Sequence, residues 1–218
     1  MANARRLFRT LLPARFGYAL DRSQKARLIP SERTRQRMSF LKSLPPEAGL
    51  LQVFQAFPKA ARPLLEYHEI LLRGESAFSP AERELIAAYV SALNKCDYCR
   101  AVHSQTAVAL GIDANAISEI LSGSGLEHVD HRMRPVLAFV RKLTLSPGAV
   151  TAADADEIFA ASWDDRALHD AAAICSLFNL MNRLVNGLGV EAPEAYTKLA
   201  AERLAKGGYK QLADILRE

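Results

Sequence analysis

The chain has 218 residues, half of them hydrophobic, which suits one domain with an extension. Three cysteines exclude a disulfide scaffold, and no apolar run reaches the ~18 residues needed to span a membrane. The net charge of +4 is uneven, because residues 1–37 hold ten Lys or Arg against Asp21 and Glu32. The rest of the chain is therefore acidic, which argues against a domain-wide nucleic-acid surface.

We interpret residues 1–37 as a basic N-terminal extension and residues 38–218 as the domain. Apolar residues between Leu7 and Leu12 can share one face of a helix, opposite several arginines. A membrane-surface helix or an organelle-targeting segment are the alternatives to a loosely ordered or domain-packed extension. The single C-x-x-C pair fits a reducing compartment, so we expect a cytoplasmic protein without an integral membrane segment.

The domain is predicted to be all-α, because apolar residues recur at helical spacing and no useful period-2 stretch occurs. Gly and Pro residues punctuate the pattern, with a flexible joint at Ser122–Gly125. In chain order, we expect helices at Ser31–Ser43, Glu47–Phe57, Arg62–Arg73, Ser79–Asn94, Cys96–Gly111, Asp113–Leu121, Arg132–Leu145, Thr151–Ala160, Asp164–Leu188, Pro193–Ala205 and Tyr209–Leu216.

The helix Asp164–Leu188 is the longest, and its apolar residues cover most of its circumference. Such a helix is buried on several sides, and we expect a homo-oligomer built partly on it. Cys175 has apolar neighbours and is interpreted as a core thiol. Asn179, Asn182 and Arg183 are interpreted as interhelical hydrogen-bonding or oligomer residues; the weaker alternative is that they line a pocket above the cysteines.

Three histidines outside the central motif are given structural interpretations. His68 lies in an apolar helical pattern and is interpreted as a packing or surface residue. His128 and His131 are spaced i, i+3, but no carboxylate–histidine pattern completes a metal set, so we expect surface residues.

The stretch Ser79–Gly111 carries the chemistry. Ser79 begins a helix with a capping-box pattern, and Cys96 opens a second helix. Cys96, Cys99 and His103 fall on one stripe of that second helix. Cysteines three residues apart on a first helical turn can form a disulfide, and the helix N-terminus favours a thiolate. A histidine one turn further on can exchange a proton near neutral pH.

Glu84 is a candidate partner for this histidine. If the two helices are antiparallel, Glu84 and His103 lie about one turn apart along them, within range of a contact. Small residues on the same stripe, Ala87, Ala88 and Ser91, let another helix approach closely. Burial would then raise the pKa of the Glu84 carboxyl group toward working pH. The alternative is a solvated first-turn residue favoured by the helix dipole.

The C-x-x-C spacing alone leaves other interpretations open. A structural pair and a zinc site share it; for zinc, Cys96, Cys99 and His103 give three ligands, with no obvious fourth. Haem attachment requires a histidine where Arg100 stands, and a thioredoxin site requires a βαβ context that the pattern lacks.

Glu84, Cys96, Cys99 and His103 together resemble the core motif of the alkylhydroperoxidase D family, also called the carboxymuconolactone decarboxylase-like superfamily. The run Phe178–Arg183 with the following Gly187–Val190 resembles its peroxidase-related subgroup. The similarity extends from Phe40 to Tyr196. It implies an all-α, homo-oligomeric helical bundle with thiol peroxidase chemistry. No cofactor or metal is expected.

The resemblance also implies roles for the four residues. Cys99 is the thiol oxidised to a sulfenic acid, Cys96 is its proton donor and resolving partner, and Glu84 and His103 form a proton relay. Cys96 and Cys99 would form the redox disulfide. Tyr98 replaces a second histidine of the best-studied members, and a phenol, with a pKa near ~10, relays protons poorly.

We therefore predict a thiol-dependent peroxidase, an antioxidant oxidoreductase. Its partners would be a peroxide, a thiol or dithiol electron donor and further copies of the chain, but no nucleic acid. The weaker relay at Tyr98 predicts lower peroxidase activity or a different substrate. The alternatives are a non-enzymatic redox-responsive oligomer and a lactone decarboxylase-like relative, although such relatives generally lack the cysteine pair.

Overall fold

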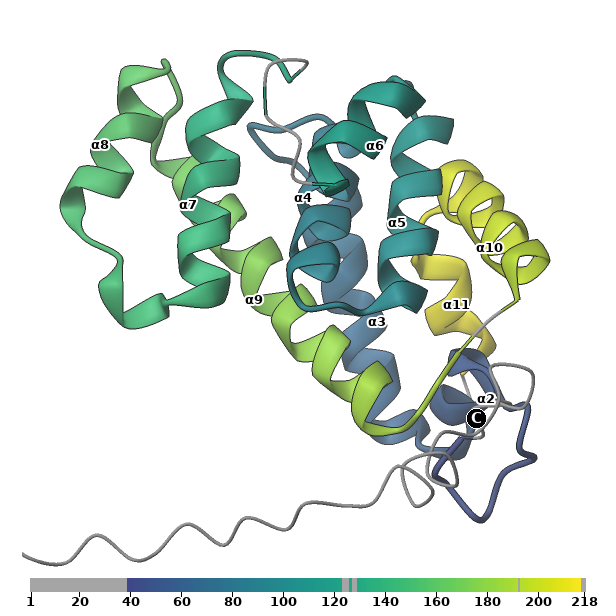
Figure 1. Cartoon of the computed structure of the whole chain (residues 1–218). Helices are drawn as coiled ribbons and strands as arrows, with labels where there is room; N and C mark the ends of the chain where they lie inside the picture. Colours follow the sequence, from purple (N-terminus) through teal and green to yellow (C-terminus); the bar gives the residue numbers. More distant parts are fainter. Residues whose placement is uncertain (1–38, 123–125, 127–128, 192, 217–218) are drawn as a thin grey trace, which may run out of the picture. The chain divides into compact units, whose positions relative to one another are not determined.

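A computed structural model describes residues 39–122, 126, 129–191 and 193–216. All regular elements in these ranges are helical, which confirms the all-α prediction (Figure 1). In chain order they are α2 (Leu50–Ala56), α3 (Pro58–Arg73), α4 (Pro80–Leu93), α5 (Asp97–Ala109), α6 (Ala114–Ser122), α7 (Met133–Leu145), the 3₁₀ turn η2 (Pro147–Ala149), α8 (Ala152–Ala160), α9 (Asp165–Gly187), α10 (Glu194–Gly207) and α11 (Lys210–Ile215).

Two predicted helices differ from the structure at the start of the domain. Residues 39–43, the described part of the predicted helix at 31–43, are not helical. The helix expected from Arg62 begins instead at Pro58, a residue that suits the first helical turn. It continues through Pro63 because its buried face packs on both sides of that proline. The basic extension, most of the Ser122–Gly125 joint and His128 lie outside the described residues.

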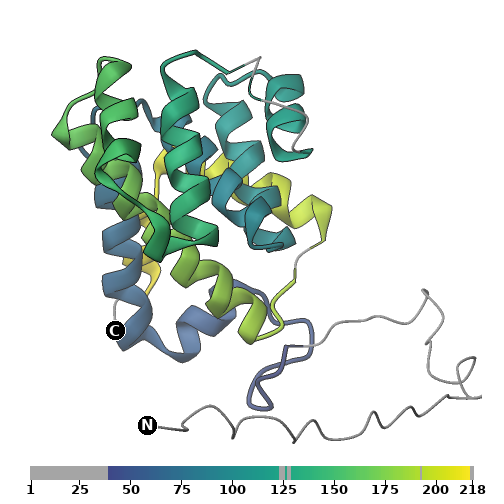
Figure 2. The ribbon, with the colours of Figure 1, turned by 60° about the vertical axis from the view of Figure 1, so that its left-hand side comes forward.

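Helices α4 and α5 form an antiparallel pair at the centre of the described domain (Figures 1 and 2). The predicted capping box is present at the start of α4, where Ser79 Oγ accepts from the Glu82 backbone N–H at 3.2 Å and Glu82 Oε2 accepts from the Ser79 N–H at 2.8 Å. Lys95 takes the left-handed conformation, with φ of 54°, at the reversal into α5. Every residue from Arg83 to Ser91 is buried, so α4 is enclosed by its neighbours.

Helix α9 crosses α4 and also packs on α3, α5, α7 and α8, which confirms burial on several sides. In the view of Figure 1, α7 and α8 lie on one side of the α4–α5 pair and α10 and α11 on the other. Cys175 is fully buried beside the Thr144 hydroxyl group, as expected for a core thiol. None of the described helices has the length and apolar character needed to cross a membrane.

Candidate active site

The predicted contact between Glu84 and His103 is present. Glu84 Oε2 accepts a hydrogen bond from His103 Nδ1 at 2.6 Å, and the Glu84 side chain is fully buried. Glu84 belongs to α4 and His103 to α5, so the antiparallel packing of these two helices brings the carboxylate and the imidazole together. The edge of the Phe178 ring of α9 packs against the imidazole, with ring centroids 4.5 Å apart.

The second carboxylate oxygen of Glu84 accepts two further hydrogen bonds. Arg73 Nη2 donates to Oε1 at 2.7 Å, and the Tyr209 hydroxyl donates to the same atom at 3.0 Å. Burial alone would raise the pKa of this carboxyl group, but His103 and Arg73 outweigh it and hold the pKa below its ordinary value. The expectation of a raised pKa is therefore wrong, and Glu84 is a buried carboxylate.

Arg73 and Tyr209 were not predicted as site residues. Arg73 ends α3 and also donates to two backbone carbonyls, those of Leu72 at 2.8 Å and Leu204 at 3.2 Å. Its guanidinium lies 5.2 Å from the centre of the Tyr209 ring. Burial, and then the Glu84 charge, raise the pKa of Tyr209 well above its ordinary value, so its hydroxyl remains a donor.

The two cysteines lie at the start of α5 as free, buried thiols. Cys96 is the N-cap residue and Cys99 lies in the first helical turn. A hydrogen bond from the Cys99 thiol, followed by the Cys99 backbone N–H and Asn182, lowers the pKa of Cys96 despite its burial. Donation of its proton to Cys96, together with burial, raises the pKa of Cys99 well above the ordinary value. Cys96 is therefore the more acidic thiol of the pair.

Asn182 joins the cysteine pair to the helices around it. Its amide Nδ2 donates to Ser91 Oγ at 3.0 Å, and its Oδ1 accepts from Asn94 Nδ2 at 3.0 Å. Its side chain also interacts with both sulfurs. The interhelical interpretation of Asn182 is thus confirmed, and the side chain lies beside the cysteines without lining the cavity next to Cys99. Arg183, in contrast, is exposed and donates to Asn179 of its own helix.

A small cavity of about 90 Å³ connects the thiol to the imidazole. Cys99, His103 and Tyr98 line it, whereas Cys96 does not. Mostly apolar side chains from α2, α3, α9, α10 and α11 complete the wall. His68 also lines this cavity, so it is a buried packing residue and not a surface histidine.

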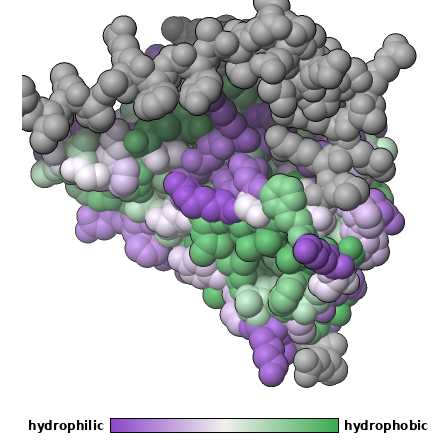
Figure 3. All heavy atoms as spheres, turned by 60° about the horizontal axis from the view of Figure 1, so that its bottom comes forward, coloured by the Kyte–Doolittle hydropathy of each residue, from purple (hydrophilic) through white to green (hydrophobic). Residues whose placement is uncertain are grey.

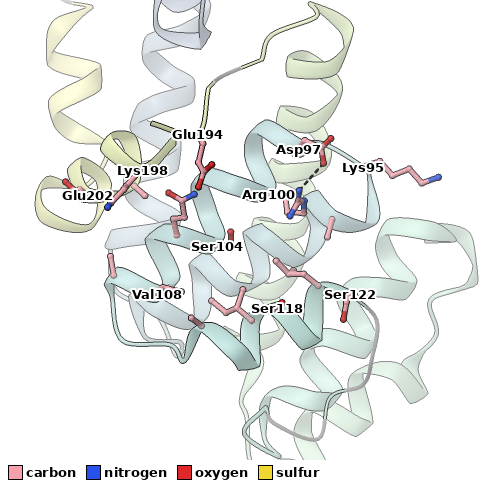
Figure 4. Close-up of a pocket in the computed structure, with 17 residues that line it drawn as sticks. Lys95, Asp97, Arg100, Ser104, Val108, Ser118, Ser122, Glu194, Lys198 and Glu202 are labelled. Atoms are coloured by element: carbon pink, nitrogen blue, oxygen red, sulfur yellow. Dashed lines mark hydrogen bonds and ion pairs between the residues drawn. The ribbon is translucent and has the colours of Figure 1, made fainter. Parts of the chain in front are cut away.

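A larger, open hollow of about 870 Å³ lies elsewhere, between α5, α6 and α10 (Figure 4). Figure 4 shows polar side chains such as Ser104, Ser118 and Glu194 around it, with an ion pair between Arg100 and Asp97 at 3.2 Å. None of the four predicted site residues lines this hollow. The candidate thiol chemistry therefore belongs to the smaller cavity.

The described residues hold no group of three or more His, Cys, Asp or Glu side chains arranged to bind a metal ion. The zinc alternative, which lacked a fourth ligand in the sequence, gains no ligand from the fold.

Comparisons with known proteins identify the fold. The model of the carboxymuconolactone decarboxylase family matches residues 58–141, which include Glu84, both cysteines of the pair and His103. A peroxidase-related protein from Silicibacter sp. TM1040 is 26% identical, with a TM-score of 0.64 over 68% of this chain and 78% of that one. The segment that carries the predicted site thus matches the carboxymuconolactone decarboxylase family, and the fold is that of alkylhydroperoxidase D-like proteins. The matched family is named for a decarboxylase, and a debrominase shares the fold.

Two further structures share the alkylhydroperoxidase D-like fold. A peroxidase-related protein with an alkylhydroperoxidase core, from Ralstonia eutropha JMP134, is 24% identical, with a TM-score of 0.64 over 68% of this chain and 78% of that one. The debrominase Bmp8 is 18% identical, with a TM-score of 0.58 over 69% of this chain and 81% of that one. No curated protein sequence matches the chain. Tyr209 lies C-terminal to the part that the family model matches.

Proposed function

We propose that the protein is a thiol-dependent peroxidase in which Cys96 and Cys99 reduce a hydroperoxide and are re-reduced by a thiol or dithiol donor. The observation that carries this proposal is the common cavity of Cys99 and His103, with His103 held from behind by the buried Glu84 carboxylate. A thiol beside a histidine–carboxylate pair has a base for its proton and a route for that proton to a leaving group.

The two cysteines differ in the acidity of their thiols and in their access to the cavity. Cys96 carries the lowered pKa but does not reach the cavity, whereas Cys99 lines the cavity and retains its proton. Because the two thiols are hydrogen-bonded, transfer of one proton from Cys99 to Cys96 moves the negative charge to the accessible sulfur. Cys99 is thus the sulfur that meets peroxide, and Cys96 is the proton donor and resolving thiol.

The peroxide step then balances as follows. The Cys99 thiolate attacks the distal oxygen of R–O–O–H, an S–O bond forms, the O–O bond breaks, and Cys99 becomes a sulfenic acid. The leaving RO⁻ takes a proton from the His103 imidazolium, which formed when the cysteine pair lost its first proton to His103, and Glu84 stabilises that imidazolium. The Cys99 sulfur and His103 share no direct hydrogen bond, so a cavity water or the substrate itself carries the proton between them.

The resolving step returns the pair to a neutral state. Cys96 attacks the Cys99 sulfur, an S–S bond forms, the S–O bond breaks, and the hydroxide leaves as water with the proton that Cys96 gives up. Only Asp97 and Tyr98 separate the cysteines, so the ring closes with little loss of chain entropy. A thiol or dithiol then reduces the disulfide, which fits a reducing compartment such as the cytoplasm.

Tyr98 takes no part in this relay. Burial, and then its neighbour Tyr196, raise the pKa of the Tyr98 hydroxyl well above its ordinary value. The two rings lie 6.4 Å apart at the wall of the cavity. A phenol that keeps its proton closes the wall beside Cys99, and the relay rests on Glu84 and His103.

Substitution of the cysteines tests the proposal. Cys99→Ser is expected to abolish peroxide consumption, because it removes the sulfur that faces the cavity. Cys96→Ser should leave a sulfenic acid on Cys99 that a dimedone-type reagent traps, as mass spectrometry will show. Cys175→Ser, a change at the buried core thiol, is the matched control and should retain wild-type turnover.

Two outcomes would contradict this assignment. Labelling of Cys96 in Cys99→Ser at the wild-type rate would reverse the two roles. Disulfide formation without catalytic turnover of peroxide, in the presence of excess dithiol, would favour the alternative of a non-enzymatic redox-responsive protein.

We also propose that the protein is a homo-oligomer. Apolar side chains reach the surface of the described domain (Figure 3), and Leu180 of α9 and Leu145 at the end of α7 are each half exposed. A second copy would cover such surface. Light scattering at micromolar concentration should give a mass that is a multiple of the 24.0 kDa chain. A monomer mass would overturn this prediction.

A further inference from the structure

His68 has a defined tautomer. It lies on α3 and is only 3% exposed. Its Nδ1 lies 2.8 Å from the carbonyl oxygen of Leu64, one helical turn earlier. A carbonyl oxygen can only accept, so Nδ1 carries the proton and Nε2 presents a lone pair.

The Nε2 lone pair reaches the cavity. His68 Nε2 makes no hydrogen bond in the described part of the protein. In that part, Gln105 Oε1 is the only fully enclosed side-chain nitrogen or oxygen atom that lacks a hydrogen-bond partner. His68 Nε2 is therefore not enclosed by protein atoms, and the space that His68 lines is the cavity shared with Cys99 and His103. Burial lowers the pKa of His68 to about 4, so the ring is neutral at working pH and Nε2 remains an acceptor.

The rest of the His68 ring is held by packing. The ring lies against Tyr209, with centroids 5.2 Å apart, and against Phe178, with centroids 5.9 Å apart. Phe178 also packs on the His103 ring. The two imidazoles are thus fixed on the same aromatic side chain and line the same cavity.

A hydroperoxide has one O–H donor on its distal oxygen and an acceptor at its proximal oxygen. His68 Nε2 offers the acceptor, and His103 Nε2, once it carries the thiol proton, offers the donor. We propose that His68 is a second catalytic imidazole, which accepts a hydrogen bond from the O–H of an organic hydroperoxide and aligns its O–O bond with the Cys99 sulfur. This inference rests on the proposed peroxidase function. His68 transfers no proton, so the balance of the peroxide step is unchanged.

The cavity also indicates which hydroperoxides fit. Its volume of about 90 Å³ is smaller than the ~150 Å³ of an apolar cavity that accepts benzene, and its wall is mainly apolar. A slim alkyl group beside the O–O bond suits this space better than a bulky tertiary group. A primary alkyl hydroperoxide is therefore the appropriate probe.

Two substitutions at His68 separate its two nitrogens. In His68→Asn, the side-chain amide can still donate to the Leu64 carbonyl, but no acceptor reaches the position of Nε2. In His68→Gln, the side-chain oxygen reaches that position. We expect kcat/KM for a primary alkyl hydroperoxide to fall about 10–100-fold in His68→Asn and to recover most of this loss in His68→Gln. His131→Asn, at an exposed histidine, is the control and should match the wild type.

A second measurement distinguishes this role from a structural one. The rate at which iodoacetamide alkylates Cys99 should be the same in His68→Asn and in the wild type, because His68 contacts the peroxide and not the thiol. Wild-type kcat/KM in His68→Asn would overturn the inference and leave the peroxidase proposal intact. Equal losses in both variants, accompanied by altered alkylation, would also overturn it, in favour of packing alone. A wild-type protein that consumes no peroxide would overturn both proposals.

Discussion

Glu84→Leu is expected to lower the free energy of unfolding by about 3–5 kcal/mol, because it leaves the Arg73 guanidinium buried without a carboxylate. The Arg73 side chain is only 13% exposed and the Glu84 side chain is fully buried. The substitution also removes the acceptor of the Tyr209 hydroxyl and of His103 Nδ1. Urea unfolding measured at pH 7 gives the difference directly.

The double variant Arg73→Met/Glu84→Leu tests the physical reason. Removal of both charges should restore much of the stability lost in Glu84→Leu, while peroxide reduction remains impaired because His103 has lost its carboxylate. The ion pair of Arg62 and Glu66 provides the control, since both side chains are about half exposed. Glu66→Leu should change stability little, because solvent screens an exposed pair. Equal losses in Glu84→Leu and Glu66→Leu would contradict the prediction.

The central part of the site could be predicted because its information is local. The capping box of α4 and the spacing of Cys96, Cys99 and His103 depend only on helical periodicity. The small residues around Glu84 indicated a close helix contact, and in the structure Ala87, Ala88 and Ser91 are fully buried. The contact between Glu84 and His103 follows from two adjacent helices joined by a short turn.

The partners that tune this centre come from distant parts of the chain. Tyr209 lies 125 residues after Glu84, and Asn182 lies 91 residues after Ser91. A polar residue in a helical pattern carries no sign of which buried group it will meet. The direction of the Glu84 pKa was therefore predicted wrongly: the burial and the His103 contact were foreseen, but not that His103 together with Arg73 outweighs the burial.

The tertiary partners of His68 also could not be predicted from the sequence, and they bear on the chemistry of the site. Its position in an apolar pattern favoured packing, and the buried ring confirms that packing. Only the fold shows that the ring packs on the aromatic side chains Phe178 and Tyr209, beside the cavity of Cys99. A packing histidine and a substrate-binding histidine have the same sequence signature, and the tertiary structure is what distinguishes them.

The buried His68 should also make the stability of the protein strongly dependent on pH. Its pKa is about 4 in the folded state against an ordinary value of 6.5, so between these values the unfolded chain binds a proton that the folded protein excludes. Stability must therefore decrease as pH falls through this range, by about 3 kcal/mol for a shift of this size. Protonation of Glu84, whose folded pKa is also lowered, acts in the same direction below its ordinary value of 4.5.

The His68→Gln variant isolates the histidine contribution to this pH dependence. The glutamine amide of this variant does not titrate. Between pH 7 and pH 4, the wild type should therefore lose about 3 kcal/mol more unfolding free energy than His68→Gln. Urea unfolding at several pH values measures that difference, in which all other titrating groups cancel. His131→Asn, a change at an exposed histidine, is the control and should follow the wild-type curve. Parallel curves for wild type and His68→Gln would show that His68 binds its proton alike in the folded and unfolded states, which would contradict the lowered pKa.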